Sequence, residues 1–156
     1  MVQLKEKSNI SKIKGKAFYI SKLVGKAIMD YNMIQDKDKI LVAVSGGKDS
    51  LSLLKILNQR LSFVPIRYDL IAVHIDLGHK CISKQILENY FKEKNYNYHI
   101  EKIDLAKESQ QEKITCFWCS WNRRKALFEV ADKLNCNKIA LGHHKDDIVE
   151  TILLNM

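Results

Sequence analysis

The sequence predicts an α/β fold in which helices cover both faces of a doubly wound parallel sheet. Strand-like and helix-like segments alternate four times along the chain, which is typical of this class. The run 70–75 (LIAVHI) is apolar almost throughout, as expected for a strand buried on both faces. With 156 residues the chain is long enough for one domain with its own core.

The elements are expected in the following order. Residues 1–16 are polar, basic and without a clear period, and form an N-terminal arm; residues 17–156 form the folded domain. Apolar residues at helical spacing predict helices from residue 17, from 51 to before Pro65, from 83, from 116 and from 148. Apolar or alternating runs predict strands at 40–44, 70–75, 96–103 and 138–141.

The net charge of +8 is concentrated near the amino terminus, where residues 1–26 hold seven lysines and one glutamate. This asymmetry favours a nucleic-acid partner, although a solvated lysine-rich face gives the same count. Lys22 and Lys26, opposite the apolar stripe of the first helix, are candidate RNA contacts. No apolar run of 18 residues and no secretory signal are found, so we expect a cytoplasmic protein with no membrane span.

Four unusual loops follow strands, at residues 45–50, 76–81, 116–119 and 142–147. Because the carboxyl ends of parallel strands meet at one edge of a sheet, we expect these loops to share a crevice. His74, inside the second apolar strand, is interpreted as a hydrogen-bonded core histidine.

The first of these loops, SGGKDS, is predicted to bind phosphate, because it joins a buried strand to a helix start. Its spacing is neither that of a Walker A loop nor that of a dinucleotide loop. Two glycines let the backbone approach a phosphate, two hydroxyls can donate hydrogen bonds and one lysine offsets negative charge. The acidic residue is expected either to cap the helix or to help hold Mg²⁺. An ordinary turn with Asp49 or Ser50 as N-cap is the alternative. The predicted nucleotide-binding residues are Ser45, Gly46, Gly47, Lys48, Asp49, Ser50 and Gly142.

The pair Cys116 and Cys119 forms a C-x-x-C motif at a predicted helix start, followed by three cations at 123–125 that are expected to form a basic first turn. Thiolates at such a position bind soft metals or attack electrophiles, and zinc, redox and iron–sulfur uses remain open. Cys136 precedes a strand, and we interpret it as a small buried residue at the opposite end of the sheet. The motif GHHKDD at 142–147 either starts a helix with acidic residues or lets Asp147 hold Mg²⁺ on a pyrophosphate.

These motifs carry a family resemblance. SGGKDS resembles the SGGxDS loop of the N-type PP-loop ATP pyrophosphatases, whose fold is Rossmann-like (adenine nucleotide alpha hydrolase-like). Together with the C-x-x-C followed by Asn-Arg-Arg, and GHHKDD running into ETILLN, it is similar to the tRNA 2-thiocytidine synthetase group. The match extends from about Lys22 to the last residue.

The resemblance implies ATP-dependent tRNA thiolation. ATP adenylates the C2 oxygen of a pyrimidine, in this group cytidine, and sulfur then replaces that oxygen. The implied cofactors are ATP, Mg²⁺ and a 4Fe-4S cluster with three cysteine ligands. The implied partners are tRNA and a cysteine desulfurase or other sulfur donor, and a homodimer is compatible with the resemblance. The implied catalytic residues are Cys116, Cys119, Asp147 and Arg123, with Cys116 and Cys119 also as metal ligands.

The sequence departs from the family because the third cluster ligand lies in a second half that it lacks. We therefore expect a fragment truncated at the C-terminus; otherwise Cys81 or a partner chain completes the site, or thiolation has been lost. Two other functions remain open. One is another PP-loop tRNA-modifying ligase with a zinc or redox C-x-x-C, and the other is a non-catalytic module that binds ATP or tRNA.

Overall fold

The computed structural model describes residues 15–78, 84–103 and 116–154. The chain divides into two compact units, Met1–Ile34 and Gln35–Met156. Within the described residues, no helix is both long and apolar enough to cross a membrane.

The first unit holds one described helix, α1 (Lys16–Asp30). The helix is followed by a left-handed residue, Asn32, whose φ is 48°. The amide of Met33 then bonds to the carbonyl of Ile28 at 2.9 Å, which satisfies one of the carbonyls that a helix end leaves open. Both lysines expected on its polar face, Lys22 and Lys26, are exposed.

The second unit is built on a four-stranded sheet in which every pairing is parallel. Its strands are β1 (Lys39–Ala43), β2 (Asp69–Asp76), β3 (Tyr98–Lys102) and β4 (Lys138–Leu141), and their order is β3-β2-β1-β4. The chain winds outward from β1 to β3 and then returns to the other side of β1. The strand order therefore reverses between β1 and β4, the position at which open α/β sheets form a ligand crevice.

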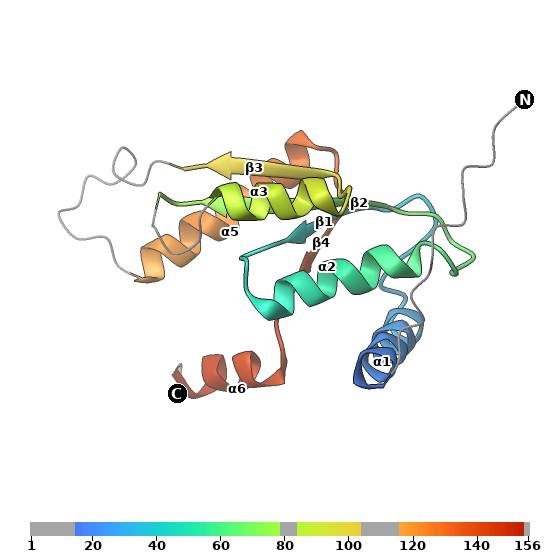
Figure 1. Cartoon of the computed structure of the whole chain (residues 1–156). Helices are drawn as coiled ribbons and strands as arrows, with labels where there is room; N and C mark the ends of the chain where they lie inside the picture. Colours follow the sequence, from blue (N-terminus) through green and yellow to red (C-terminus); the bar gives the residue numbers. More distant parts are fainter. Residues whose placement is uncertain (1–14, 79–83, 104–115, 155–156) are drawn as a thin grey trace, which may run out of the picture. The chain divides into compact units, whose positions relative to one another are not determined.

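Each strand is followed by a helix: α2 (Lys48–Arg60), α3 (Lys84–Glu93), α5 (Cys116–Lys133) and α6 (Lys145–Leu154). Figure 1 shows α2 and α3 in front of the sheet and α5 behind it. This arrangement confirms the predicted doubly wound α/β fold, and it explains why the central strands read as nearly continuous apolar runs.

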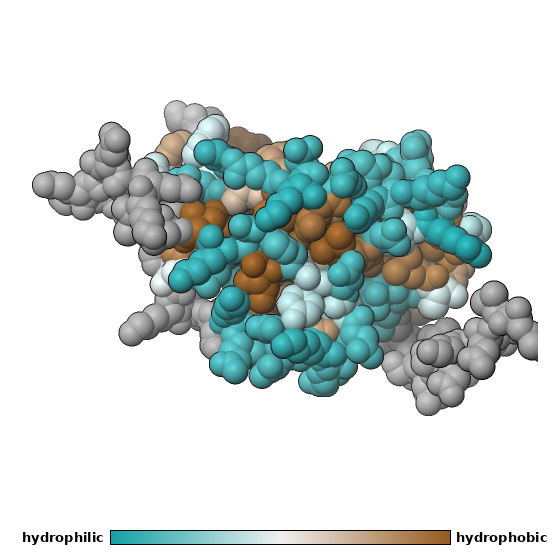
Figure 2. Space-filling view, turned by 90° about the horizontal axis from the view of Figure 1, so that it is seen from above, coloured by the Kyte–Doolittle hydropathy of each residue, from teal (hydrophilic) through white to brown (hydrophobic). Residues whose placement is uncertain are grey.

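The core lies against both faces of the two central strands. Leu41, Val42, Ala72 and Val73 have no exposed surface. On the α5 side, the buried stripe of that helix packs on β1 and β2 in one cluster made of Leu41, Ile71, Val73, Ile75, Leu77, Ala126, Leu127, Val130 and Ala131. On the face drawn in Figure 2, hydrophobic residues lie in separate patches among hydrophilic ones. The packing thus fixes the direction of β1 and β2, whose carboxyl ends carry the candidate site.

Candidate functional site

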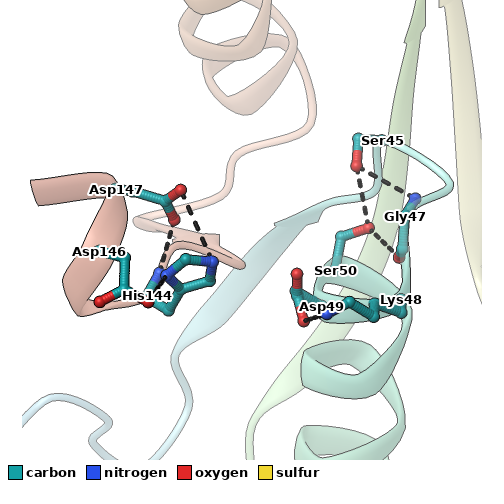
Figure 3. Close-up of polar contacts among 8 residues, drawn as sticks. All are labelled: Ser45, Gly47, Lys48, Asp49, Ser50, His144, Asp146 and Asp147. Atoms are coloured by element: carbon teal, nitrogen blue, oxygen red, sulfur yellow. Dashed lines mark hydrogen bonds and ion pairs between the residues drawn. The ribbon is translucent and has the colours of Figure 1, made fainter. Parts of the chain in front are cut away.

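The loop between β1 and α2 folds around its own two hydroxyl groups (Figure 3). Ser45 Oγ lies 3.2 Å from Ser50 Oγ and accepts a hydrogen bond from the Gly47 amide at 3.3 Å. Ser50 Oγ donates to the Gly47 carbonyl at 3.0 Å. Gly46 has a φ of 91°, in the region that favours glycine, so the turn requires this residue type.

The start of α2 has no side-chain cap. Its N-cap is Gly47, and the first helical hydrogen bond runs from the Leu51 amide to the Gly47 carbonyl at 3.2 Å. The expectation that Asp49 or Ser50 caps the helix is therefore wrong: both lie inside the first turn. An uncapped helix start presents backbone N–H groups and the positive end of the helix dipole to a ligand.

The two charged residues of the loop extend from its surface. The Lys48 and Asp49 side chains are 88% and 50% exposed, and their charged atoms are 3.8 Å apart. At this exposure and separation the pair contributes little to stability. Lys48 is therefore available to an anion that binds at the helix start.

Gly142, at the end of β4, packs directly on this helix start. A Cβ at position 142 would lie 2.8 Å from the Ser50 amide nitrogen and 2.9 Å from Ser50 Cα. Backbone atoms cannot move out of the way as a flexible side chain can, so glycine is required here. Gly142 thus holds β4 against the loop. The sequence analysis predicted nucleotide binding for Gly142 but not this packing role.

A cavity of about 190 Å³ opens where these segments meet. Its lining combines the ends of β1, β2 and β4 with the middle of α5: Ala43, Val44, Ser45, Ser50, Val73, His74, Ile75, Arg123, Leu127, Leu141, Gly142 and His143. Hydroxyl groups, one guanidinium and an apolar wall from separate elements thus share one space. Such a space suits a ligand with an anionic and an apolar part.

Arg123 reaches the cavity from the third turn of α5, because the helix begins at Cys116. The expectation that residues 123–125 form a basic first turn is wrong. The field of the helix dipole decays within the first turn, so it does not oppose these cations. Arg123 is exposed, so its charge is accessible to a bound anion.

His74, which we interpreted from the sequence as a hydrogen-bonded core histidine, also lines this cavity. Its Nδ1 lies 2.7 Å from the Val44 carbonyl oxygen, which can only accept, so Nδ1 carries the proton. The interpretation as a hydrogen-bonded histidine is confirmed. A histidine inside an otherwise apolar strand was the signal that could have placed it at the site.

The cysteine motif occupies the first turn of α5, on the side of the sheet to which the strand arrowheads point in Figure 1. Cys119 is partly buried and packs with Ile103 and Trp118 against the core cluster. Among the residues that the structure describes, no three His, Cys, Asp or Glu side chains are grouped as metal ligands. Cys81, a proposed third ligand, lies outside the described residues.

Cys136 precedes β4 at the other end of the sheet, as predicted, and is partly buried. Burial raises the pKa of its thiol, while the charge of Lys39 acts in the opposite direction. Cys136 is therefore a protonated thiol at neutral pH and contributes to packing.

Asp147 stabilises the start of α6. One carboxylate oxygen accepts a hydrogen bond from the His144 amide at 2.7 Å, and the other lies 3.8 Å from His144 Nε2. Figure 3 shows the carboxylate pointing toward His144. This contact is half of a capping box, in which the third helical residue bonds back to the N-cap amide. The acidic helix start that we considered is thus present, and a magnesium role for Asp147 stays a prediction.

Known proteins resemble the chain in sequence and in fold. The family model of the PP-loop domain matches residues 18–156. The chain is 46% identical over 137 residues to the tRNA-cytidine(32) 2-sulfurtransferase of Acidovorax ebreus, covering 85% of this chain and 43% of that protein. It is 48% identical over 140 residues to the enzyme of the same name from Syntrophotalea carbinolica, covering 87% of this chain and 54% of that one. The chain thus spans about half the length of the curated relatives it matches.

Solved structures share the fold. The U34-tRNA thiolase NcsA from Methanococcus maripaludis, solved with its 4Fe-4S cluster, superposes with a TM-score of 0.74 at 23% identity, covering 89% of this chain and 49% of that one. The NH3-dependent NAD synthetase from Campylobacter jejuni gives a TM-score of 0.50 at 17% identity, covering 78% and 53%. At these identities the likeness concerns the fold alone.

Proposed function

Because the chain belongs to the PP-loop domain family, we propose that it is the ATP-binding half of an enzyme that thiolates a pyrimidine of tRNA. The relatives that it matches at 46% and 48% identity are tRNA-cytidine(32) 2-sulfurtransferases, so cytidine is the proposed base. The observation that carries the proposal is the cavity in which Ser45, Ser50 and Arg123 meet beside an uncapped helix start.

In this proposal the cavity binds ATP and the loop holds its phosphates. The free amides at the start of α2 and the Lys48 ammonium offset the charge that builds up on the leaving pyrophosphate. Arg123, which lines the same cavity, stabilises the α-phosphate. Asp49 and Asp147 are the proposed carboxylates for Mg²⁺, and Asp147 would have to leave its contact with the His144 amide to bind it.

The proposed thiolation has two steps, adenylation of the C2 oxygen of the base and replacement of that oxygen by sulfur. The C2 oxygen of the base attacks the α-phosphorus of ATP, an O–P bond forms, and the bond to the β-phosphate breaks to release pyrophosphate. A sulfur nucleophile then attacks C2, and the C2–O bond breaks with AMP as the leaving group. Adenylation is needed because an unactivated carbonyl oxygen is a very poor leaving group.

Cys116 and Cys119 are the proposed residues of the sulfur step. Both residues belong to the first turn of α5, three positions apart in the C-x-x-C motif. They fit two ligands of a 4Fe-4S cluster, which would supply an open iron for a sulfur atom. A third ligand is missing from the described residues.

The test is anaerobic reconstitution with iron and sulfide, followed by ATP, Mg²⁺, sulfide and unmodified tRNA. We expect AMP and thiolated tRNA when the chain is supplemented with the remaining half of a relative. Cys116→Ser is expected to abolish thiolation with little change in the Kd for ATP, while Lys48→Ala weakens ATP binding. Equal loss of ATP binding in both variants, or no AMP from the complemented protein, would contradict the proposal.

A second candidate is a module that binds ATP and RNA without turnover. Because the chain covers 43% and 54% of two of the relatives that it matches, the two candidates are compared in the complemented protein. The second candidate predicts ATP binding by the chain alone, with no pyrophosphate release even after complementation.

A further inference from the structure

The outward side of α5 carries exposed aromatic residues that the proposed chemistry does not use. Phe117, Trp121 and Phe128 are 78%, 61% and 66% exposed. They recur at intervals of four and seven residues, so they lie on one side of the helix. The core-facing residues Ala126, Leu127, Val130 and Ala131 occupy the opposite side. The three rings span roughly 16 Å along the helix axis, from the 1.5 Å rise per residue.

Cations lie between these rings. Arg124 and Lys125 are both exposed and fall between Trp121 and Phe128 along the helix. Lys125 is 3.7 Å from Glu129 in a pair whose side chains are 60% and 65% exposed, so the pair is weak and easily exchanged. Arg124 and Phe128 also line a cavity of about 670 Å³ between α5 and β4, which contains Asp132 as its acidic residue. The surface is therefore hollowed, aromatic and basic.

We propose that this aromatic face, formed by Phe117, Trp121, Arg124, Lys125 and Phe128, binds single-stranded RNA by base stacking. Rings that alternate with cations suit a strand whose bases and phosphates also alternate. Exposed apolar patches of this kind mark interaction sites. The inference rests on the proposed function in taking the RNA substrate as the occupant.

The charge of the face supports an RNA strand as its occupant. Arg124 and Lys125 are both exposed beside the rings, and phosphate groups complement such cations. Arg123 and Cys119 lie on the inner side of the same helix, where Arg123 lines the cavity proposed for ATP and Cys119 packs against the core cluster.

The experiment measures RNA binding by the full chain at two or more salt concentrations, with an unmodified tRNA transcript, a single-stranded 8-mer and a duplex 8-mer. We expect Trp121→Ala and Phe128→Ala each to weaken single-strand binding about 10-fold, in line with stacking on one ring. Arg124→Ala is expected to reduce the log-log salt slope by about 0.7. The duplex should bind more weakly than the single strand.

The matched control is Phe63→Ala. Phe63 is 58% exposed and has the Arg60 guanidinium 5.4 Å from its ring centre, so it is also an aromatic residue beside a cation. It follows α2, away from α5, and its removal should leave RNA affinity unchanged. A second readout uses Trp118→Phe, which leaves Trp121 as the remaining one of the two tryptophans. Single-stranded RNA should quench its fluorescence.

Several outcomes would overturn the proposal that the aromatic face binds RNA. These are no RNA binding by the unsubstituted chain, unchanged affinity in the Trp121 and Phe128 variants, or equal binding of duplex and single strand. Self-association in sedimentation that disappears in these variants would assign the face to a second copy of the chain. If AMP is formed and the variants keep their RNA affinity, RNA binding by the aromatic face is rejected and the proposed function stands. If the variants bind RNA more weakly and no AMP is formed, the proposed function is rejected and RNA binding by the face stands.

Discussion

The two ends of the sheet use their polar residues in opposite ways. At the amino end, polar side chains from distant parts of the chain bond to one another. At the carboxyl end, the polar groups of the loop after β1 bond mainly within that loop and line a cavity. The bonds at the first end stabilise the sheet, and we propose that the second end binds a ligand.

The amino end is centred on Asp38, which is 5% exposed. Its carboxylate accepts hydrogen bonds from the Gln35 amide at 2.6 Å and from Asn137 Nδ2 at 2.7 Å, and it lies 3.1 Å from Lys138 Nζ. Asn137 Oδ1 in turn accepts from the Lys39 amide at 2.8 Å. These bonds join the starts of β1 and β4 and fix their register.

At the carboxyl end, the cations are exposed and the helix start has no side-chain cap. The Gly142 backbone, packed on Ser50, holds the two sides of the crevice at a fixed distance. The carboxyl end can leave hydrogen-bond donors open because the bonds at the amino end already hold β1 and β4 together. Substitutions at the two ends should therefore affect different measurements.

The largest expected effect is on stability at the amino end. Asp38→Ala removes the carboxylate that contacts Lys138 and Asn137 and should lower the free energy of unfolding by about 3 kcal/mol, the low end for breaking a buried pair, because Lys138 is partly exposed. Urea unfolding measures this change. The control Asp36→Ala removes an exposed carboxylate that accepts from the Arg67 amide, and about 1 kcal/mol or less should be lost. If folded Asp38→Ala binds ATP more weakly, the claim that the amino end affects stability alone is wrong.

The next effect links the two ends. Gly142→Ala forces a Cβ against the Ser50 backbone and should destabilise the protein by about 2 kcal/mol while also weakening ATP binding. The matched change is Gly47→Ala, whose Cβ would meet Ser45 Oγ at an ordinary 3.4 Å. It should cost at most about 1 kcal/mol, which is the loss expected when alanine, a poorer N-cap, replaces glycine. Thermal unfolding and calorimetric titration with ATP measure both quantities, and equal stability losses in the two variants would be inconsistent with the close packing.

A smaller effect is expected at the carboxyl end alone. Lys48→Ala should raise the Kd for ATP about 10-fold, equivalent to about 1.4 kcal/mol. Stability should not change, because the Lys48 side chain is 88% exposed. Lys55→Ala, further along α2, serves as the control with unchanged affinity. A stability loss in Lys48→Ala without weaker ATP binding would reverse the assigned roles.

The smallest effect concerns pH. Burial alone would raise the pKa of Asp38, but the bonds from Gln35, Asn137 and Lys138 outweigh it, and the pKa is lowered. A lowered folded pKa gives stability that is complete above the unfolded value of about 3.9 and is lost as pH falls through the folded value. The difference in unfolding free energy between the unsubstituted protein and Asp38→Asn should be constant near pH 6 and shrink below about pH 4. If this free-energy difference grows as the pH falls, the lowered pKa of Asp38 is contradicted.

The sequence predicted the sheet and the loops because their signals are local. The runs at 40–44 and 70–75 match β1 and β2 within one residue, since burial on both faces demands continuous apolar residues. Parallel strands then bring Ser45 and Gly142 to one edge without further information. The predicted strand 96–103 is longer than β3, because the apolar alternation already begins at Tyr96, before the residues that pair.

What the sequence missed depends on contacts between distant residues. Asp38 and Asn137 are 99 positions apart, and no spacing rule joins them. The close packing of Gly142 on Ser50 and the Arg123 position in the cavity likewise follow from how α5 and β4 dock. The N-cap at Gly47 was missed because residues that prefer caps follow it directly in the sequence.

The most direct test of nucleotide binding at the carboxyl end is hydrogen exchange of the full chain with and without ATP and Mg²⁺. Binding at the uncapped start of α2 should protect the amides of residues 46–50 and leave those of residues 38–40 and 137–138 unchanged. Protection at the amino end, or ATP binding that leaves residues 46–50 unprotected, would contradict the site.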